Sequence, residues 1–336
     1  MSALASLHTF GLSAQARKII PIRTLNDVQH IIAATQPFFI LGEGSNTVFT
    51  EDFAGTVFLN QLLGKTLSET DEDYVLRVAS GENWHALVQW CLARGIGGFE
   101  NLALIPGTVG AAPIQNIGAY GVEIKQFVDC VDYIDLTTGE HISISGDACE
   151  FGYRDSIFKH ALKERAFITA VHFRLPKDYA LVTSYGELKD LATPSMHDVF
   201  DCVVGIRSAK LPDPKQVGNA GSFFKNPVIA VEHYHALKAA YADLPAYPVN
   251  TDSVKVPAAW LIDQLGFKGK RHGGVQCHPR QALVLTNAAQ ATGEELITFA
   301  QTIQAKVRET FGIAIENEVC LVGKCGLREL NDAKES

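Results

Sequence analysis

The chain has 336 residues, of which 47% are hydrophobic and 20% charged, with a formal net charge of −8. This length allows two or three domains, and this composition is that of a globular protein rather than of a disordered chain. The acidic balance without a lysine–arginine cluster argues against a nucleic-acid partner. Because the net charge is negative, an anionic ligand would depend on local cations. No apolar run is long enough to span a membrane.

The N-terminal segment lacks a charged start followed by a continuous apolar run, so we expect no signal peptide. The seven cysteines are scattered, odd in number and form no Cys-x-x-Cys pair. This pattern disfavours a disulfide framework and a zinc site, and it favours a reducing, cytoplasmic location. We therefore predict no metal and treat the cysteines as small core or surface residues.

In chain order, the first half reads mainly as strands. A polar, helix-like stretch at 24–35 lies between two short apolar runs, and helical spacing of apolar residues predicts a helix over Trp84–Arg94 that Gly95 ends. Val128–Leu136 and Glu140–Ile144 are expected to pair as a hairpin. The other predicted strands are Ile19–Ile22, Phe38–Leu41, Val57–Asn60, Tyr74–Ala79 and Ala166–Leu175.

The second half follows a proline-rich segment, Leu211–Pro214. Its two prolines disfavour helix and donate no hydrogen bonds, so a domain boundary is expected there. Helices are predicted over Val256–Leu265 and Gly293–Thr310, with a strand at Ala282–Thr286 between them. Strands and helices alternate irregularly rather than as regular βαβ units, which indicates the α+β class.

Two turns rich in small residues carry the functional signal. Leu41–Asn46 (LGEGSN), the first glycine turn, follows an apolar run and so lies at a strand end. Ile105–Gly121 (IPGTVGAAPIQNIGAYG), the glycine-rich loop, carries no charged side chain. Glycine lets a backbone approach a bulky group, and exposed N–H groups suit a diphosphate. The pair favours a dinucleotide held from two sides over a set of ordinary turns.

Other nucleotide-binding motifs fit poorly. Gly42–Gly44 begins like the dinucleotide fingerprint, but Thr47 stands where a glycine is expected, and the acidic partner about twenty residues on is missing. Gly64–Thr66 ends like a phosphate-binding loop, yet Leu59 occupies the position of its first glycine. We therefore predict an ordinary turn at Gly64–Thr66.

Five motifs occur in the order typical of one enzyme family: LGEGSN, IPGTVGAAPIQNIGAYG, GYRDSIF, GNAGSFFKNP and IENEV. By these motifs the chain resembles the UDP-N-acetylenolpyruvoylglucosamine reductases, from about Leu12 to Gly323. The segment Ser184–Leu188 (SYGEL) matches the longer of the two family subtypes. Each motif alone is moderately specific, whereas the ordered set is highly specific.

The resemblance implies an α+β fold in which an FAD-binding fold of the vanillyl-alcohol-oxidase (PCMH) type is joined to a C-terminal α+β substrate-binding domain. It divides the chain into an FAD-binding subdomain 1 at 1–63, to which the tail 312–336 returns, an FAD-binding subdomain 2 at 64–211, and the substrate-binding domain at 212–311.

The resemblance also implies the activity. Side chains cannot donate hydride, so a cofactor must. In this family non-covalent FAD is reduced by NADPH and then reduces UDP-N-acetylglucosamine enolpyruvate to UDP-N-acetylmuramate for peptidoglycan synthesis. We expect such an oxidoreductase, acting on a CH–CH group, to be a cytoplasmic monomer without nucleic-acid or membrane partners. Two alternatives stay open: an FAD-dependent alcohol or sugar oxidase of the same fold, and a non-catalytic nucleotide-binding protein.

Three residues match the catalytic positions of the family. Ser222 in GNAGSFFKNP matches the proton donor, although by itself a serine beside glycine is most often a turn residue. Arg154 in GYRDSIF and Glu318 in IENEV match the residues that stabilise the enolic intermediate. Without the resemblance, Arg154 could simply pair with Asp155, and Glu316 competes with Glu318.

The remaining matches concern binding. The family usually has a cation two residues after the catalytic glutamate, where this chain has Cys320. Candidate substrate contacts are Tyr185, Lys210, Asn226 and Gln281. Candidate FAD contacts are Gly42, Gly44, Ser45, Asn46, Pro106, Gly107, Thr108, Ala111, Ala112, Gly118, Ala119 and Tyr120.

Overall fold

The computed structural model describes residues 1–331 and groups the chain into two compact units. Unit 1 comprises residues 1–17, 44–55 and 210–336, of which 332–336 lie outside the described residues. Unit 2 comprises residues 18–43 and 56–209. The three-part division expected from the resemblance stays a prediction, and the end of its tail also falls outside the described residues.

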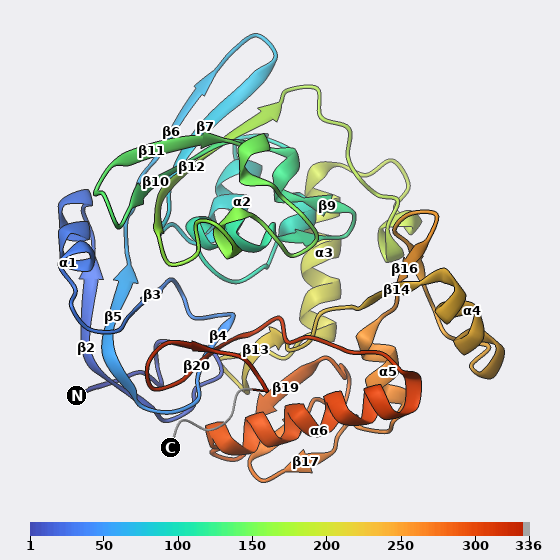
Figure 1. Cartoon of the computed structure of the whole chain (residues 1–336). Helices are drawn as coiled ribbons and strands as arrows, with labels where there is room; N and C mark the ends of the chain where they lie inside the picture. The colour runs from blue at the N-terminus through green and yellow to red at the C-terminus, as the bar shows by residue number, and fades with distance from the viewer. Residues whose placement is uncertain (332–336) are drawn as a thin grey trace. The chain divides into compact units, whose positions relative to one another are not determined.

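Unit 2 is built on an antiparallel sheet of five strands in the order β11-β10-β12-β7-β6 (Figure 1). Residues alternate in and out along these strands, and one face contributes Val78, Val131 and Val171 to a buried core. The strands are β6 (Lys65–Glu69), β7 (Asp73–Ala79), β10 (Val128–Asp135), β11 (His141–Ser145) and β12 (Ala166–Pro176).

Helix α2 (Trp84–Leu92) joins this core through Trp84, Leu87, Val88 and Cys91. The Asn83 side chain accepts the N–H of Ala86 and so satisfies one donor of the first helical turn. The other elements of unit 2 are η1 (Leu25–Val28), α1 (Gln29–Ile32), β3 (Phe38–Leu41), η2 (Glu100–Leu102), η3 (Val109–Ala111), η4 (Pro113–Gln115), β8 (Gly118–Ala119), β9 (Val122–Glu123), η5 (Ile124–Gln126), η6 (Asp147–Cys149), η7 (Ile157–Lys159), η8 (Gly186–Asp190) and α3 (Met196–Lys210), which ends at the unit boundary.

Unit 1 has a separate core around helix α6 (Gly293–Phe311), which buries Leu296, Phe299, Ile303 and Val307. Thr292 and Glu295 cap its start reciprocally, and Gly312 ends it with a φ of 65°. The helix packs with the antiparallel sheet β13-β19-β18-β17. These strands are β13 (Gly218–Ser222), β17 (Arg271–His272), β18 (Val275–Cys277) and β19 (Val284–Asn287).

A parallel pair in unit 1 joins distant parts of the chain, since β4 (Thr47–Phe49) pairs with β20 (Cys320–Val322). Strands β2 (Gln15–Ile22) and β5 (Phe53–Asn60) contain the chain positions where one unit ends and the other begins. The other elements are β1 (Ser2–Ala3), β14 (Val228–Ala230), α4 (Val231–Ala240), β15 (Tyr247–Pro248), β16 (Ser253–Lys255), α5 (Ala258–Gln264) and β21 (Leu327–Arg328).

The predicted strands, the hairpin and the helices α2, α5 and α6 are confirmed within a few residues at their ends. The turn predicted at Gly64–Thr66 is wrong beyond Gly64, because β6 begins at Lys65 and pairs with β7. Helices α3 and α4 were not predicted. None of the helices within residues 1–331 combines the length and apolar character needed to cross a bilayer.

Candidate active site

The first glycine turn and the glycine-rich loop meet in unit 2. A Cβ on Gly42 would lie 2.9 Å from Thr108 Oγ1, so a side chain there would force the loop away. The Glu43 carboxylate accepts the N–H of Gly107 at 3.0 Å and also the side-chain amide of Asn83. The structure thus brings together the two segments that the sequence predicts to share one ligand.

The glycine-rich loop is fixed from behind by the backbone before α2. The N–H groups of Val109 and Gly110 donate to Glu82 O and Ser80 O, both at 2.8 Å. A Cβ on Gly110 would lie 2.5 Å from Ser80 Cβ, so this glycine permits contact between two backbones. These donors are used within the protein. The loop residues that are exposed or half-buried are Ile105, Pro106, Ala111, Ile114, Gln115, Gly118, Ala119, Tyr120 and Gly121.

The GYRDSIF segment is attached to the other side of the same loop. Ser156 Oγ donates to Ile114 O at 2.7 Å, and Arg154 Nη2 donates to Gly118 O at 3.2 Å. Arg154 has a φ of 54°, a left-handed conformation that is uncommon outside glycine and concentrates at functional sites. Asp155 instead accepts from His160 at 2.9 Å. The Arg154 guanidinium is therefore held beside the half-buried part of the glycine-rich loop.

A tyrosine of the glycine-rich loop packs against a second tyrosine. The rings of Tyr120 and Tyr185 are 6.1 Å apart and nearly perpendicular. Tyr185 is 45% exposed and directly precedes η8. Its phenol thus lies at the surface next to a predicted cofactor contact, as a residue that covers a ligand requires.

A second guanidinium near Arg154 was not predicted. Arg207, on α3, donates through Nε to Leu104 O at 3.3 Å and bonds Tyr120 with its side chain. Burial lowers the pKa of Arg207, and the like charge of Arg154 lowers it further, although the group stays cationic at neutral pH. The two cations concentrate positive charge beside the loop in a protein that is acidic overall.

Leu104 directly precedes the glycine-rich loop, and side chains of two helices, α2 and α3, hold it in a strained backbone conformation. Its φ is 57°. Its N–H donates to His85 Nδ1 at 3.0 Å, while its carbonyl accepts from Arg207. Burial, with a smaller contribution from Arg207, lowers the pKa of His85. The imidazole is therefore neutral at neutral pH, which allows Nδ1 to accept this bond.

In unit 1, Ser222 and Glu318 lie on neighbouring segments. Ser222 pairs with Val284 at the end of β13, and the next residue, Phe223, accepts the N–H of Glu318 at 2.8 Å. The Asn46 side chain donates to the carbonyl of Glu318 at 3.2 Å. This chain of contacts places three residues from three distant motifs together.

The other unit 1 candidates have defined surroundings. Glu316 is exposed and pairs with Lys225 at 3.2 Å, whereas Glu318 is half-buried, which favours Glu318 as the site carboxylate. Asn226 Oδ1 accepts the first N–H of α5, from Ala258, at 2.9 Å. Gln281 lies in the turn before β19, and Lys210 is exposed at the end of α3.

Comparisons with known proteins show to which family the chain is similar. A family model described as an FAD-binding domain matches residues 17–145, and the UDP-N-acetylenolpyruvoylglucosamine reductase C-terminal domain matches residues 213–322. The chain is 53% identical to the reductase of Pseudoalteromonas atlantica over 97% of this chain and 95% of the relative. It is 46% identical to that of Vibrio parahaemolyticus, over 99% and 97%.

A solved structure supports the fold. The reductase from Thermus caldophilus covers 95% of this chain and 97% of its own, with a TM-score of 0.66 and 21% identity. The match to the FAD-binding domain and the likeness to this solved structure confirm the predicted fold class. Together they define the chain as a flavin-dependent oxidoreductase of the PCMH type. The relatives of about half-identical sequence specify the group: the chain belongs to the UDP-N-acetylenolpyruvoylglucosamine reductase family.

The site fits a flavin in one respect that can be read from this chain alone. Four small residues, Ala111, Gly118, Ala119 and Gly121, are among the loop residues that the protein leaves exposed or half-buried. Flat ring systems need such close backbone approach. No loop residue brings a charge that would oppose a diphosphate.

Proposed function

We propose that this chain reduces UDP-N-acetylglucosamine enolpyruvate to UDP-N-acetylmuramate at the expense of NADPH, a step of peptidoglycan synthesis. The observation that supports the proposal is the bond from Glu318 N–H to Phe223 O, because it joins the backbones of the two family motifs that contain Glu318 and Ser222. When bound, FAD supplies the hydride chemistry that side chains lack, taking hydride from NADPH and passing it to the substrate.

The residues that would hold FAD belong to the first glycine turn and the glycine-rich loop. Glu43, Ser80 and Glu82 fix the loop backbone in advance, so less conformational entropy is lost when the cofactor binds. The proposed contacts are Gly42, Gly44, Ser45, Asn46, Pro106, Gly107, Thr108, Ala111, Ala112, Gly118, Ala119 and Tyr120.

Ser222 is the proposed acid. Hydride addition at the vinyl carbon leaves a carbanion-like, enolic centre next to the substrate carboxylate, and the Ser222 hydroxyl gives its proton to that carbon. A serine is a weak acid, so the step requires a strongly basic centre and groups that stabilise it. We assign this stabilisation to Arg154, whose planar fork matches a carboxylate, and to Glu318.

Substrate binding is assigned to four residues. The Tyr185 hydroxyl and the Lys210 ammonium can both donate to a diphosphate. Asn226 uses its Oδ1 to cap α5, so we propose that it contacts substrate through Nδ2. Gln281 is the fourth. We further propose a cytoplasmic monomer, a location that agrees with the seven free cysteines in residues 1–331.

The test follows the flavin absorbance under nitrogen. NADPH should bleach the protein-bound flavin, and the enolpyruvyl substrate should restore its colour with formation of UDP-N-acetylmuramate. Reoxidation by oxygen in the presence of an alcohol or sugar, but not by the enolpyruvyl substrate, would support the oxidase alternative. Protein that stays colourless after incubation with FAD would overturn the proposal.

A further inference from the structure

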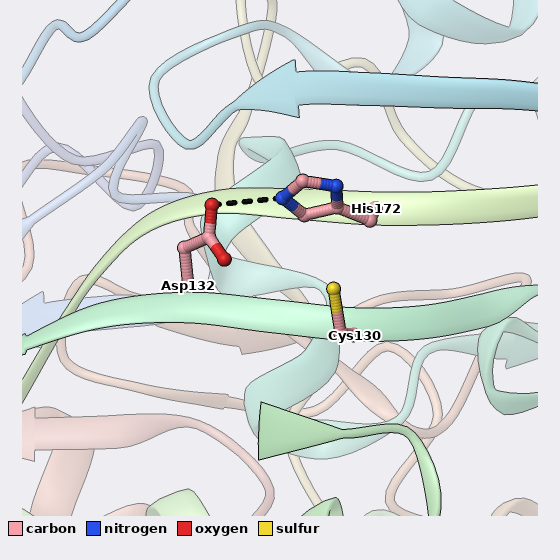
Figure 2. Close-up of side chains that lie close together, drawn as sticks. All are labelled: Cys130, Asp132 and His172. Atoms are coloured by element: carbon pink, nitrogen blue, oxygen red, sulfur yellow. Dashed lines mark hydrogen bonds and ion pairs between the residues drawn. The ribbon is translucent and has the colours of Figure 1, made fainter. Parts of the chain in front are cut away.

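Three potential metal ligands share one face of the unit 2 sheet, outside the proposed active site (Figure 2). Cys130 and Asp132 are two residues apart on β10, and His172 is the register partner of Cys130 on β12. The intervening Val131 and the neighbouring Val171 are fully buried in the core on the other face. Strand periodicity alone therefore turns all three ligands to the same side.

The three side chains converge. Their ligand atoms, one from each residue, all lie within 4.8 Å of one another. His172 Nε2 is 2.8 Å from Asp132 Oδ2, and the side chains of His172 and Asp132 are 23% and 25% exposed. The cluster is thus half-buried, sheltered enough to favour ion binding and open enough to admit an ion and a water ligand.

We propose, against the expectation from the scattered cysteines of the sequence, that Cys130, Asp132 and His172 bind a divalent ion of the zinc class, with water completing a four-coordinate shell. The donor set of one thiolate sulfur, one imidazole nitrogen and one carboxylate oxygen matches zinc and cobalt, whereas calcium and magnesium select oxygen ligands. Binding releases the thiol proton to solvent. The ion would link β10 to β12.

Groups around the cluster set the conditions for binding. Ser143, the register partner of Asp132 on β11, bonds both Cys130 and Asp132 through its side chain and so orients two of the ligands. The Arg77 Nε atom is 3.6 Å from Asp132 Oδ2, but its side chain is 45% exposed and can turn to solvent when an ion arrives. The same atoms make an ion pair without metal, which is the competing interpretation.

The experiment uses the full chain with its flavin. Protein is equilibrated with zinc sulfate, passed through a desalting column and analysed for metal, and cobalt binding is followed by d–d absorption at wavelengths beyond the flavin bands. We expect about one ion per chain with tetrahedral cobalt intensity. Cys130→Ser and His172→Asn should each weaken zinc binding by at least about 10-fold, because the loss of an outer-shell partner alone already costs that much.

Matched variants separate the site from nonspecific binding. Cys202→Ser removes another half-buried thiol, on α3, and Asp129→Asn removes the carboxylate next to Cys130 that pairs with Arg174. Both should keep wild-type zinc affinity. Two results would overturn the proposal: zinc retention by the folded Cys130→Ser, Asp132→Asn, His172→Asn triple variant equal to wild type, or no retained ion in wild type, as the ion-pair interpretation requires.

Discussion

At the scale of single residues, Ser222 offers the sharpest test, because only one half of the reaction needs a proton from it. Flavin reduction by NADPH requires no protein acid. We expect Ser222→Ala to keep this half-reaction near the wild-type rate. Reoxidation by the enolpyruvyl substrate should slow by about 10²–10⁴-fold, the usual contribution of general acid catalysis. Stopped-flow measurement of the two half-reactions checks this.

The control for Ser222 is Ser253→Ala. Ser253 is also half-buried in unit 1, but its hydroxyl donates to Asn250, which has no proposed catalytic role. This control should leave both rates unchanged. If Ser222 is only a turn residue, its alanine variant would slow both half-reactions modestly and together.

Tyr185 tests the proposed diphosphate contact. Tyr185→Phe keeps the ring that packs against Tyr120 and removes only the hydroxyl. Loss of a hydrogen bond to a charged group costs about 1.5–3 kcal/mol, so substrate binding should weaken by roughly 10–150-fold with flavin content unchanged. Equilibrium titration of the oxidised enzyme measures this. The control, Tyr247→Phe, changes a similarly exposed tyrosine of unit 1 and should bind substrate normally. If Tyr185→Phe has the KM and kcat of the wild type, Tyr185 does not belong to the site.

At the scale of elements, α2 positions the glycine-rich loop through His85. His85→Ala leaves the half-buried N–H of Leu104 without its acceptor, and an unsatisfied donor that is shielded from water costs about 1–3 kcal/mol. We expect FAD affinity to fall by roughly 5–150-fold, measured by recovery of flavin fluorescence on dilution.

The conservative variant distinguishes positioning from general destabilisation. In His85→Asn the amide oxygen can take the place of Nδ1 as acceptor, so FAD affinity should return most of the way to wild type. Equal loss of FAD in the alanine and asparagine variants would show that His85 does not act through Leu104.

The elements also show what a sequence can reveal. Helix α6 can be predicted from the sequence, because its cap, apolar spacing and terminal glycine all agree. Helix α3 carries comparable signals, with the Ser195–Asp198 cap and buried Val199, Val203 and Ile206, and could have been found the same way. Strand β6 offers no apolar alternation, since four of its five residues are exposed, and only its pairing with β7 makes it a strand.

The candidate site was predictable as a list of motifs but not as a set of contacts. Motif order predicts Arg154, Ser222 and Glu318 as site residues. The bonds that hold them, from Arg154 to Gly118 and from Glu318 to Phe223, join segments far apart in the chain. Arg207 carries no motif at all, and its relation to Tyr120 depends on how α3 packs.

At the scale of the whole molecule, the N-terminal segment is what completes unit 1. The Thr9 N–H donates to Gly44 O at 3.0 Å, and the Thr9 hydroxyl donates to Asn219 O at 2.7 Å. One short segment therefore ties together all three parts of the chain that form this unit. His8, the neighbour of Thr9, is 3% exposed, lies edge-on to Phe49 and donates through Nε2 to Leu12 O at 3.3 Å.

This buried histidine makes the stability of unit 1 depend on pH. Burial lowers the pKa of His8 to about 4, from 6.5. Between these values the unfolded chain binds a proton that the folded chain excludes, so the free energy of unfolding falls as pH drops from 6.5 to 4, by up to about 3 kcal/mol.

His8→Gln keeps a donor for Leu12 and cannot titrate. The difference in denaturant midpoint between wild type and His8→Gln should therefore shift in favour of the variant across this window, before most carboxylates protonate. The control, His141→Gln, changes an exposed histidine and should show no such shift. If the difference in denaturant midpoint between wild type and His8→Gln stays constant from pH 7 to 4, His8 is protonated without cost in the folded protein.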